Sequence, residues 1–203
     1  MSKPFNLLFF QLVITSLCFP IFYFFGKVLQ PLNSFIFSFI SYWVLLSIGI
    51  FSMLIFDNET TILLRQLIFS SRKKLLLLFN FFPIPALVLI VFIPNISHFS
   101  IPLISMVLAI AVSNGILEEL FWRGIVLSKY SHSNLLLAAS TTVFALFHFA
   151  FLLLPLQYHG GALNLVGGAA IMGFLWIFIS KLTRNISLAI LAHIAVNFLA
   201  FCG

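Results

Sequence analysis

Long apolar runs separated by short polar breaks dominate the 203-residue chain. Each run is close to the roughly 20 residues that an α-helix needs to cross the hydrocarbon core of a bilayer. The runs do not alternate apolar and polar residues as barrel strands do, so helices are expected. The predicted spans are 5–25, 33–56, 75–94, 100–128, 134–154, 162–180 and 186–201. The pattern therefore predicts an all-α, polytopic transmembrane bundle of about seven spans, with residues 1–203 forming a single integral-membrane domain.

The composition excludes a soluble globular domain. Hydrophobic residues make up 63% of the chain and charged residues only 7%, and the mean hydropathy is +1.22. The first apolar run follows Lys3 and lacks a small-residue cleavage site, so we expect it to be retained as a helix. The two cysteines, Cys18 and Cys202, have neither the spacing of a disulfide framework nor that of a metal site.

Basic residues are distributed unevenly between the breaks. One segment, 57–74, mixes four basic side chains with leucine, isoleucine and phenylalanine, which predicts a cytoplasmic amphipathic segment on the membrane surface. A cytoplasmic N-terminus places nearly all basic residues on the cytoplasmic side and only Lys27 outside, as the positive-inside rule requires. This orientation explains the net charge of +6. No stretch interleaves basic and aromatic residues, so the expected partner is the lipid bilayer and not nucleic acid. In a bacterium the location would be the plasma (inner) membrane.

Two adjacent acids, Glu118 and Glu119, interrupt the fourth apolar run in a chain with only four acidic residues. A charge within a span costs roughly 2.5 to 3.5 kcal/mol on insertion scales, so such residues are usually functional. Arg123 follows Glu119 at the i,i+4 spacing and in the favourable order for a helical ion pair. Glu118 is rotated about 100° away and has no obvious local cation, which favours a general base. The alternative is that all three residues form a purely structural cluster.

Polar residues in two later spans are expected at a similar depth. Counting about 1.5 Å per residue from the cytoplasmic ends places Glu118, His148, His193 and Asn197 roughly 12 to 21 Å into the membrane. A lone histidine in a membrane helix often serves only as an interhelical hydrogen bond. Three helices that bring polar groups to one layer instead predict an active-site cavity entered from the cytoplasmic half.

The polar positions fall into three ordered motifs. They are Glu-Glu-x-x-x-Arg (Glu118, Glu119, Arg123), Phe-x-x-x-His (Phe144, His148) and His-x-x-x-Asn (His193, Asn197). In this order, and each within an apolar helix, the motifs resemble those of the CPBP, or Abi, family of intramembrane glutamic endopeptidases. That family includes CAAX prenyl proteases and proteins tied to bacteriocin processing or self-immunity. The resemblance covers about residues 100–200, which would be the catalytic core.

The resemblance implies a role for each matching residue. Glu118 and His148 would activate a water molecule for attack on a peptide carbonyl. His193 and Asn197 would donate hydrogen bonds to the oxyanion, a contribution often worth about 3 to 4 kcal/mol per donor.

The remaining site residues would support this chemistry. Glu119 and Arg123 would brace the site, and the aromatic side chains of Phe144 and Trp122 are candidates for substrate binding. The partner would be a peptide or protein substrate at the membrane, and the mechanism would need no cofactor and no metal.

Three alternatives remain open from the sequence. A zinc peptidase could use either glutamate with His148 and His193, although there is no His-Glu-x-x-His motif and Arg123 disfavours a nearby dication. A non-enzymatic immunity or scaffold protein could bind a membrane peptide through the same polar pocket. A proton-coupled transporter could also use buried acids and histidines, although the chain has no paired halves.

Several glycines lie in and before the sixth predicted span. They are Gly160, Gly161, Gly167, Gly168 and Gly173. Small residues allow membrane helices to approach one another closely, so we expect tight helix packing at these positions.

Overall fold

A computed structural model of the chain describes residues 5–57, 78–98, 100–156 and 160–202. Within these ranges the chain is helical and contains no strand. The predicted surface segment 57–74 lies outside the described residues, apart from its first residue.

The helices agree with the predicted spans. In chain order they are α1 (Phe5–Val28), α2 (Pro31–Asp57), a helix built from η1 (Phe79–Phe81), α5 (Ile84–Leu87), η2 (Val88–Phe92), α6 (Ile93–Asn95) and η3 (Ile96–His98), then α7 (Ile101–Glu119) with η4 (Leu120–Ile125) and α8 (Val126–Tyr130), α9 (Asn134–Phe147) with η5 (His148–Leu153), α10 (Gly161–Thr183) and α11 (Ser187–Phe201). Of the described part, five helices are long and apolar enough to cross a membrane, and two further apolar helices are shorter. The predicted polytopic all-α bundle is therefore confirmed.

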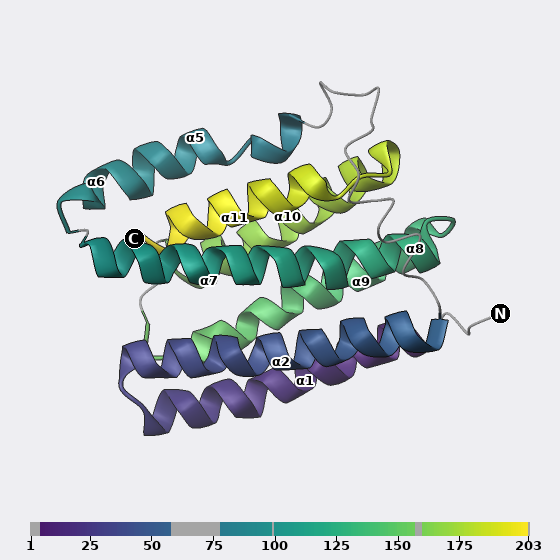
Figure 1. Ribbon diagram of the computed structural model, residues 1–203, viewed down its shortest axis with the longest axis horizontal. Helices are drawn as coiled ribbons and strands as arrows, with labels where there is room; N and C mark the ends of the chain where they lie inside the picture. Colours follow the sequence, from purple (N-terminus) through teal and green to yellow (C-terminus); the bar gives the residue numbers. More distant parts are fainter. Residues whose placement is uncertain (1–4, 58–77, 99, 157–159, 203) are drawn as a thin grey trace.

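Successive helices run back and forth along one axis, so the start of α1 and the end of α11 lie at opposite ends of the bundle (Figure 1). Helices α1 and α2 pack together on one side, and α5, α10 and α11 lie on the other. Helix α7 lies between these groups and contacts both α2 and α11. The glutamate pair at the end of α7 is therefore surrounded by the rest of the bundle.

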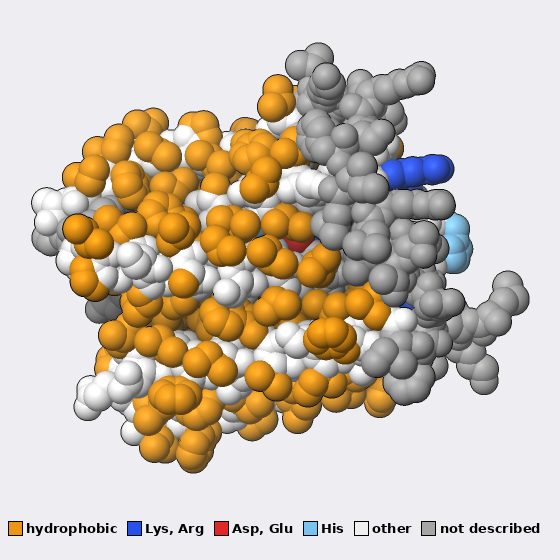
Figure 2. Space-filling view, viewed as in Figure 1, with side chains coloured by type: hydrophobic (Ala, Val, Ile, Leu, Met, Phe, Trp, Pro, Cys, Tyr) orange, Lys and Arg blue, Asp and Glu red, His pale blue; other side chains and the backbone are white. Residues whose placement is uncertain are grey.

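The flank of the bundle is covered by hydrophobic side chains (Figure 2). The lysine, arginine and histidine side chains visible in this view gather at the end where the N-terminus lies. Lys129 and Lys181 are in the last turns of α8 and α10, which end there, whereas Lys27 is in the last turn of α1 at the opposite end. This is the distribution that the positive-inside rule associates with a cytoplasmic N-terminus.

Polar side chains mark the starts of the three helices that carry the predicted site residues. The side-chain oxygens of Ser100 and Ser133 accept hydrogen bonds from backbone N–H groups in the first turns of α7 and α9, at 3.4 and 3.3 Å. Asn185 does the same for α11 at 3.0 Å. Such caps satisfy donors that have no partner within the helix, and so fix where each helix begins.

The helices depart from α geometry beside the site. A π-helical turn, η4, begins directly after Glu119, and a 3₁₀ segment, η5, begins at His148. Single π turns within α-helices are frequent at functional sites because they redirect side chains.

Gly115 permits a close approach between α7 and α11. A Cβ atom on Gly115 would lie 2.8 Å from Ile194 Cγ1 and 3.0 Å from the Ile194 backbone nitrogen. Real Cβ contacts are essentially never as short as the first distance, and the second is tighter than nine in ten of them, so a larger residue here would force Ile194 to move. This contact lies three residues before Glu118 and directly after His193.

The prediction of tight helix packing at the glycines in and before the sixth span holds for only some of them. Gly173 packs against Thr141 and Phe144, with Cβ distances of 3.0 and 3.2 Å, as expected. The prediction is wrong for Gly161, Gly167 and Gly168, since no heavy atom lies within 4 Å of the position that a Cβ atom would take. These three glycines are not at a close helix contact.

Candidate active site

A buried charge cluster joins α7 to α11. His193 Nδ1 donates a hydrogen bond to Glu119 Oε1 at 2.7 Å, and His193 Nε2 lies 3.3 Å from Glu118 Oε2. Arg123 Nη1 lies 3.1 Å from Glu119 Oε1. Both glutamates are 0% exposed, Arg123 is 1% exposed and His193 is 4% exposed. The four side chains therefore form one network that is sealed from the surroundings in this arrangement.

The two glutamates have different partners. Glu119 contacts both Arg123 and His193, so the ion pair predicted from the i,i+4 spacing is present. The direct contact of Arg123 is with Glu119, and Arg123 acts on Glu118 only through its charge. In this arrangement neither Glu118 oxygen receives a hydrogen bond from the described residues. The family resemblance implies an oxyanion role for His193, and in this arrangement His193 lies between the two glutamates.

Aromatic rings surround the cationic end of the cluster. The guanidinium carbon of Arg123 lies 4.1 Å from the centre of the Phe144 ring and 5.6 Å from the centre of the Trp176 ring. The Trp176 ring also lies 4.7 Å from that of His193. Cation–π contacts of this kind stabilise a charge away from water. Phe144 was predicted to bind substrate, but it is buried here beneath Arg123, and Trp176 was not predicted at all.

His148 lies at the edge of the cluster. Its Nδ1 donates a hydrogen bond to the backbone carbonyl of Phe144 at 3.0 Å, and its side chain is half-buried. This bond leaves the Nε2 lone pair available, because a neutral imidazole has one donor and one acceptor nitrogen. His148 makes no hydrogen bond with Glu118. It is close enough to interact electrostatically with His193 and Arg123.

Asn197 is one helical turn beyond His193 on α11. Its Nδ2 atom is buried and has no hydrogen-bond acceptor among the described residues. A buried amide without a partner is destabilising, so such groups call for an explanation such as a bound water or a substrate. Asn197 therefore presents a donor next to the charge cluster.

Helix α2 contributes a tyrosine to the wall of the site. Trp122 Nε1 donates a hydrogen bond to the Tyr42 hydroxyl at 2.9 Å. Trp122 was predicted to bind substrate, but it is only 2% exposed and contacts Tyr42 instead. Tyr42 was not predicted from the sequence. The i,i+4 spacing of Ser34, Ser38 and Tyr42 could have indicated a polar stripe on one face of α2, and all three residues are fully buried.

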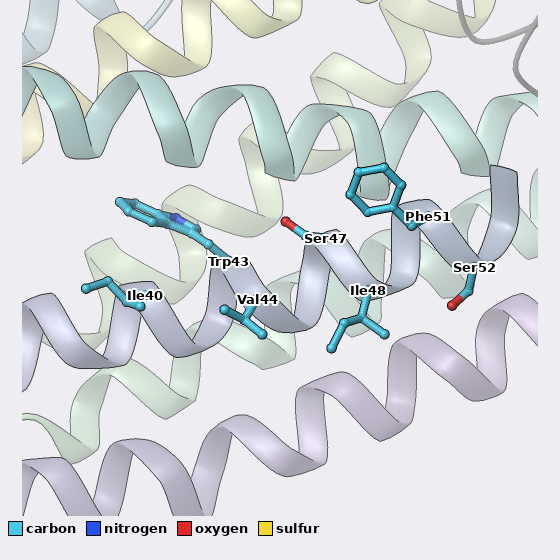
Figure 3. Close-up of a pocket in the computed structure, with 7 residues that line it drawn as sticks. All are labelled: Ile40, Trp43, Val44, Ser47, Ile48, Phe51 and Ser52. Atoms are coloured by element: carbon cyan, nitrogen blue, oxygen red, sulfur yellow. The ribbon is translucent and has the colours of Figure 1, made fainter. Parts of the chain in front are cut away.

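An apolar groove of about 510 Å³ lies on the outer face of α2 (Figure 3). It is lined by Ile40, Trp43, Val44, Ser47, Ile48, Phe51 and Ser52. None of the predicted site residues lines it. Its Trp43 donates a hydrogen bond through Nε1 to Asn114 Oδ1 at 3.1 Å, one helical turn before Glu118. The groove is therefore adjacent to the buried cluster but separate from it.

The zinc alternative requires three ligands to converge. Across the ranges that the structure describes, no three His, Cys, Asp or Glu side chains are grouped so that they could hold a metal ion. The Nδ1 atom of His148 is already engaged by the Phe144 carbonyl.

Comparison with known proteins identifies the C-terminal half. Residues 100–199 match the sequence profile of the type II CAAX prenyl endopeptidase Rce1-like family. By this match, that half of the chain belongs to the CPBP, or CAAX protease, family, as the ordered motifs indicated. The family supports an intramembrane endopeptidase of the CAAX-protease type in general. Comparisons with curated proteins and with solved structures gave no match.

Replacing Arg123 with alanine should destabilise the protein as well as inactivate it. Breaking a buried pair by removing one partner typically costs about 3 to 5 kcal/mol, because the other charge, here Glu119, stays buried without compensation. Thermal unfolding in detergent measures the change. The control is Arg184→Ala, since Arg184 is exposed, and it should unfold like the wild type. An unchanged unfolding temperature for the Arg123 variant would contradict the bracing role.

Proposed function

We propose that this protein is an intramembrane endopeptidase that hydrolyses peptide bonds of membrane-associated substrates, with Glu118 as the general base. One observation carries the proposal, namely the unequal environment of the two buried glutamates. Glu119 is held directly by Arg123 at 3.1 Å and by His193 Nδ1 at 2.7 Å, whereas His193 Nε2 approaches Glu118 only to 3.3 Å. A carboxylate in this position is suited to accept a proton, while its neighbour is suited to hold the site together.

The proposed reaction begins with a water molecule bound between Glu118 and His148. Glu118 accepts one proton from the water, and the water oxygen attacks the carbonyl carbon of the scissile bond. The Nε2 lone pair of His148 is the second acceptor for this water, because Nδ1 already donates to Phe144. Two acceptors on one water orient its oxygen lone pair toward the substrate.

Attack converts the carbonyl oxygen into an oxyanion. Asn197 Nδ2 is a buried donor without a partner, so it is suited to stabilise this charge. His193 would be the second donor, and it would have to release one of its glutamate contacts as the substrate enters. The tetrahedral intermediate then collapses, the C–N bond breaks, and the proton on Glu118 passes to the leaving amine. The products are a new carboxyl terminus and a new amino terminus, and Glu118 is ionised again.

Comparative peptidomics of cells that express the wild-type chain or the Glu118→Gln variant tests the proposal. Peptides that appear only with the wild type would identify the substrate and the cleaved bond. His148→Asn should remove the same products, whereas His132→Asn, at an exposed turn, should not. Identical peptide profiles for the wild-type and Glu118→Gln chains would favour the immunity or scaffold alternative, in which the polar pocket binds a peptide without cleaving it.

Strong chelators should leave the activity intact. The proposed reaction uses only side chains and water, so incubation of the purified protein with EDTA and with 1,10-phenanthroline should change the rate by less than about twofold. The readout is cleavage of the product-defining peptide in detergent or liposomes. A known zinc protease treated in parallel shows that the chelators are effective. Loss of activity that added Zn²⁺ restores would instead favour the zinc peptidase.

A further inference from the structure

Glu118 is buried, and in this arrangement its oxygens accept no hydrogen bond from the described residues, although His193 Nε2 approaches to 3.3 Å. Ionised carboxylates in an apolar interior need donors or opposite charges around them. A base that is free to rotate would also present its lone pairs to the water in the wrong direction for part of the time. A hydrogen-bond donor on the side of Glu118 that faces away from α11 would therefore raise the efficiency of Glu118 as a general base.

Tyr42 brings a hydroxyl to that side from α2. Its side chain is fully buried, and its ring stacks on Phe147 with centroids 4.1 Å apart and an interplanar angle of 19°. The hydroxyl receives the hydrogen bond from Trp122 Nε1 at 2.9 Å. Because an indole N–H is only a donor, the tyrosine oxygen must accept here, and its own proton is left for another acceptor. The stacking fixes the ring, and the indole fixes the hydroxyl.

Glu118 is placed to be that acceptor. Trp122 follows Glu118 by four residues on the same helix, so the hydroxyl that Trp122 holds lies beside the glutamate. Tyr42 and Glu118 also interact electrostatically. We propose that Tyr42 is a positioning residue, whose hydroxyl donates a hydrogen bond to the Glu118 carboxylate and holds it toward the hydrolytic water. The inference rests on the proposed function of Glu118.

Tyr42 belongs to α2, in the N-terminal half of the chain. The family match covers residues 100–199, and Tyr42 lies outside it. Helix α2 packs directly on α7 and η4, which carry Glu118 and Trp122. The N-terminal half thus contributes a specific polar group to the site as well as apolar packing.

Tyr42→Phe tests the role, since it removes the hydroxyl and keeps the stacked ring. A hydrogen bond to a charged group contributes enough that kcat should fall by about 10- to 100-fold, with KM changed by less than about threefold. The control is Tyr130→Phe, another fully buried tyrosine, in α8. It should retain kcat within about twofold even if its stability falls. An unchanged kcat for Tyr42→Phe would overturn the proposal.

A second variant separates positioning from simple packing, because Tyr42→Phe also deprives the Trp122 indole of its acceptor. If that loss caused the defect, the double variant Tyr42→Phe/Trp122→Phe would recover the kcat of Trp122→Phe alone. If the hydroxyl acts on Glu118, the double variant stays at least as slow as Tyr42→Phe. Recovery in the double variant would therefore also overturn the proposal.

A spectroscopic measurement separates this inference from the proposed function. The chain has four tyrosines, so ¹³Cζ-tyrosine NMR of the detergent-solubilised protein gives few signals, and that of Tyr42 is the one lost in Tyr42→Phe. Replacing Glu118 with glutamine should shift this signal and leave that of Tyr23 in place. A shift in a protein without protease activity would reject the proposed function and keep the contact. An unmoved signal would reject the contact, whatever the activity.

Discussion

Replacing Glu118 with glutamine should nearly abolish peptide hydrolysis while leaving the fold intact. Glutamine has almost the same shape but cannot accept a proton, and general-base catalysis typically contributes about 10²- to 10⁴-fold. We therefore expect kcat to fall by at least about a hundredfold. The thermal stability in detergent should be unchanged or higher, because the substitution removes the cost of keeping a charge buried. This pair of results would distinguish a catalytic carboxylate from a structural one.

Single-turnover kinetics on the purified protein, with the peptide found by comparative peptidomics, gives the rate. Asp57→Asn, at the last residue of α2, controls for the loss of an acidic residue as such and should retain wild-type activity. Turnover by the Glu118 variant within about tenfold of wild type would refute the general-base assignment. A variant that loses activity only because it unfolds would show that Glu118 belongs to a structural cluster.

Gly115→Ala should inactivate the protein by a different route, through the spacing of α7 and α11. The added methyl group would lie 2.8 Å from an Ile194 side-chain atom and 3.0 Å from the Ile194 backbone nitrogen. A side chain can rotate away but the backbone cannot, so α11 must shift. His193 precedes Ile194 and must move with it, which would loosen its contacts with Glu118 and Glu119. A misplacement of about 1 Å in a catalytic site can cost about a hundredfold in rate.

The stability of the Gly115 variant should also fall, because overpacking typically costs about 1 to 3 kcal/mol. Gly168→Ala is the matched control, since no heavy atom lies within 4 Å of its Cβ position. Alanine is favoured over glycine within a helix by about 1 kcal/mol, so this control should be as stable as the wild type or slightly more stable. Equal stability and activity of the two variants would mean that the α7–α11 contact does not hold the site together.

The number and limits of the helices could be predicted from the sequence because lipid leaves a chain few options. Every backbone polar group within the bilayer needs an internal partner, so an apolar run of sufficient length becomes a helix. For the predicted third span, 75–94, hydropathy predicts a helix but not its internal geometry. Its described part is a succession of short 3₁₀, α and π segments from Phe79 to His98, which hydropathy does not reveal.

Contacts within one helix were predictable, whereas contacts between helices were not. The Glu119–Arg123 pair follows from the i,i+4 spacing on a single helix. Depth counting placed the histidines near the glutamates but could not give their rotation about the helix axes. It therefore missed that His193 lies between both glutamates and that His148 turns to the Phe144 carbonyl.

Tyr42 and Trp176 were missed for another reason. In a chain with 17% aromatic residues, a single tyrosine or tryptophan gives no signal of its own. Their importance comes from neighbours far away in the sequence, namely Trp122 for the first and Arg123 and His193 for the second. Only the packing of the bundle brings these groups together.

The π turn η4 also sets the rotational register of everything that follows it. A π turn holds one residue more than an α turn, so α8 is rotated by about 100° relative to an uninterrupted helix. Val126, Leu127 and Tyr130 are buried in that rotated register. The helix thus contains the equivalent of a one-residue insertion between the glutamate pair and the buried residues of α8. Losing a residue from η4 would therefore restore regular α geometry while leaving α8 seated against its present neighbours.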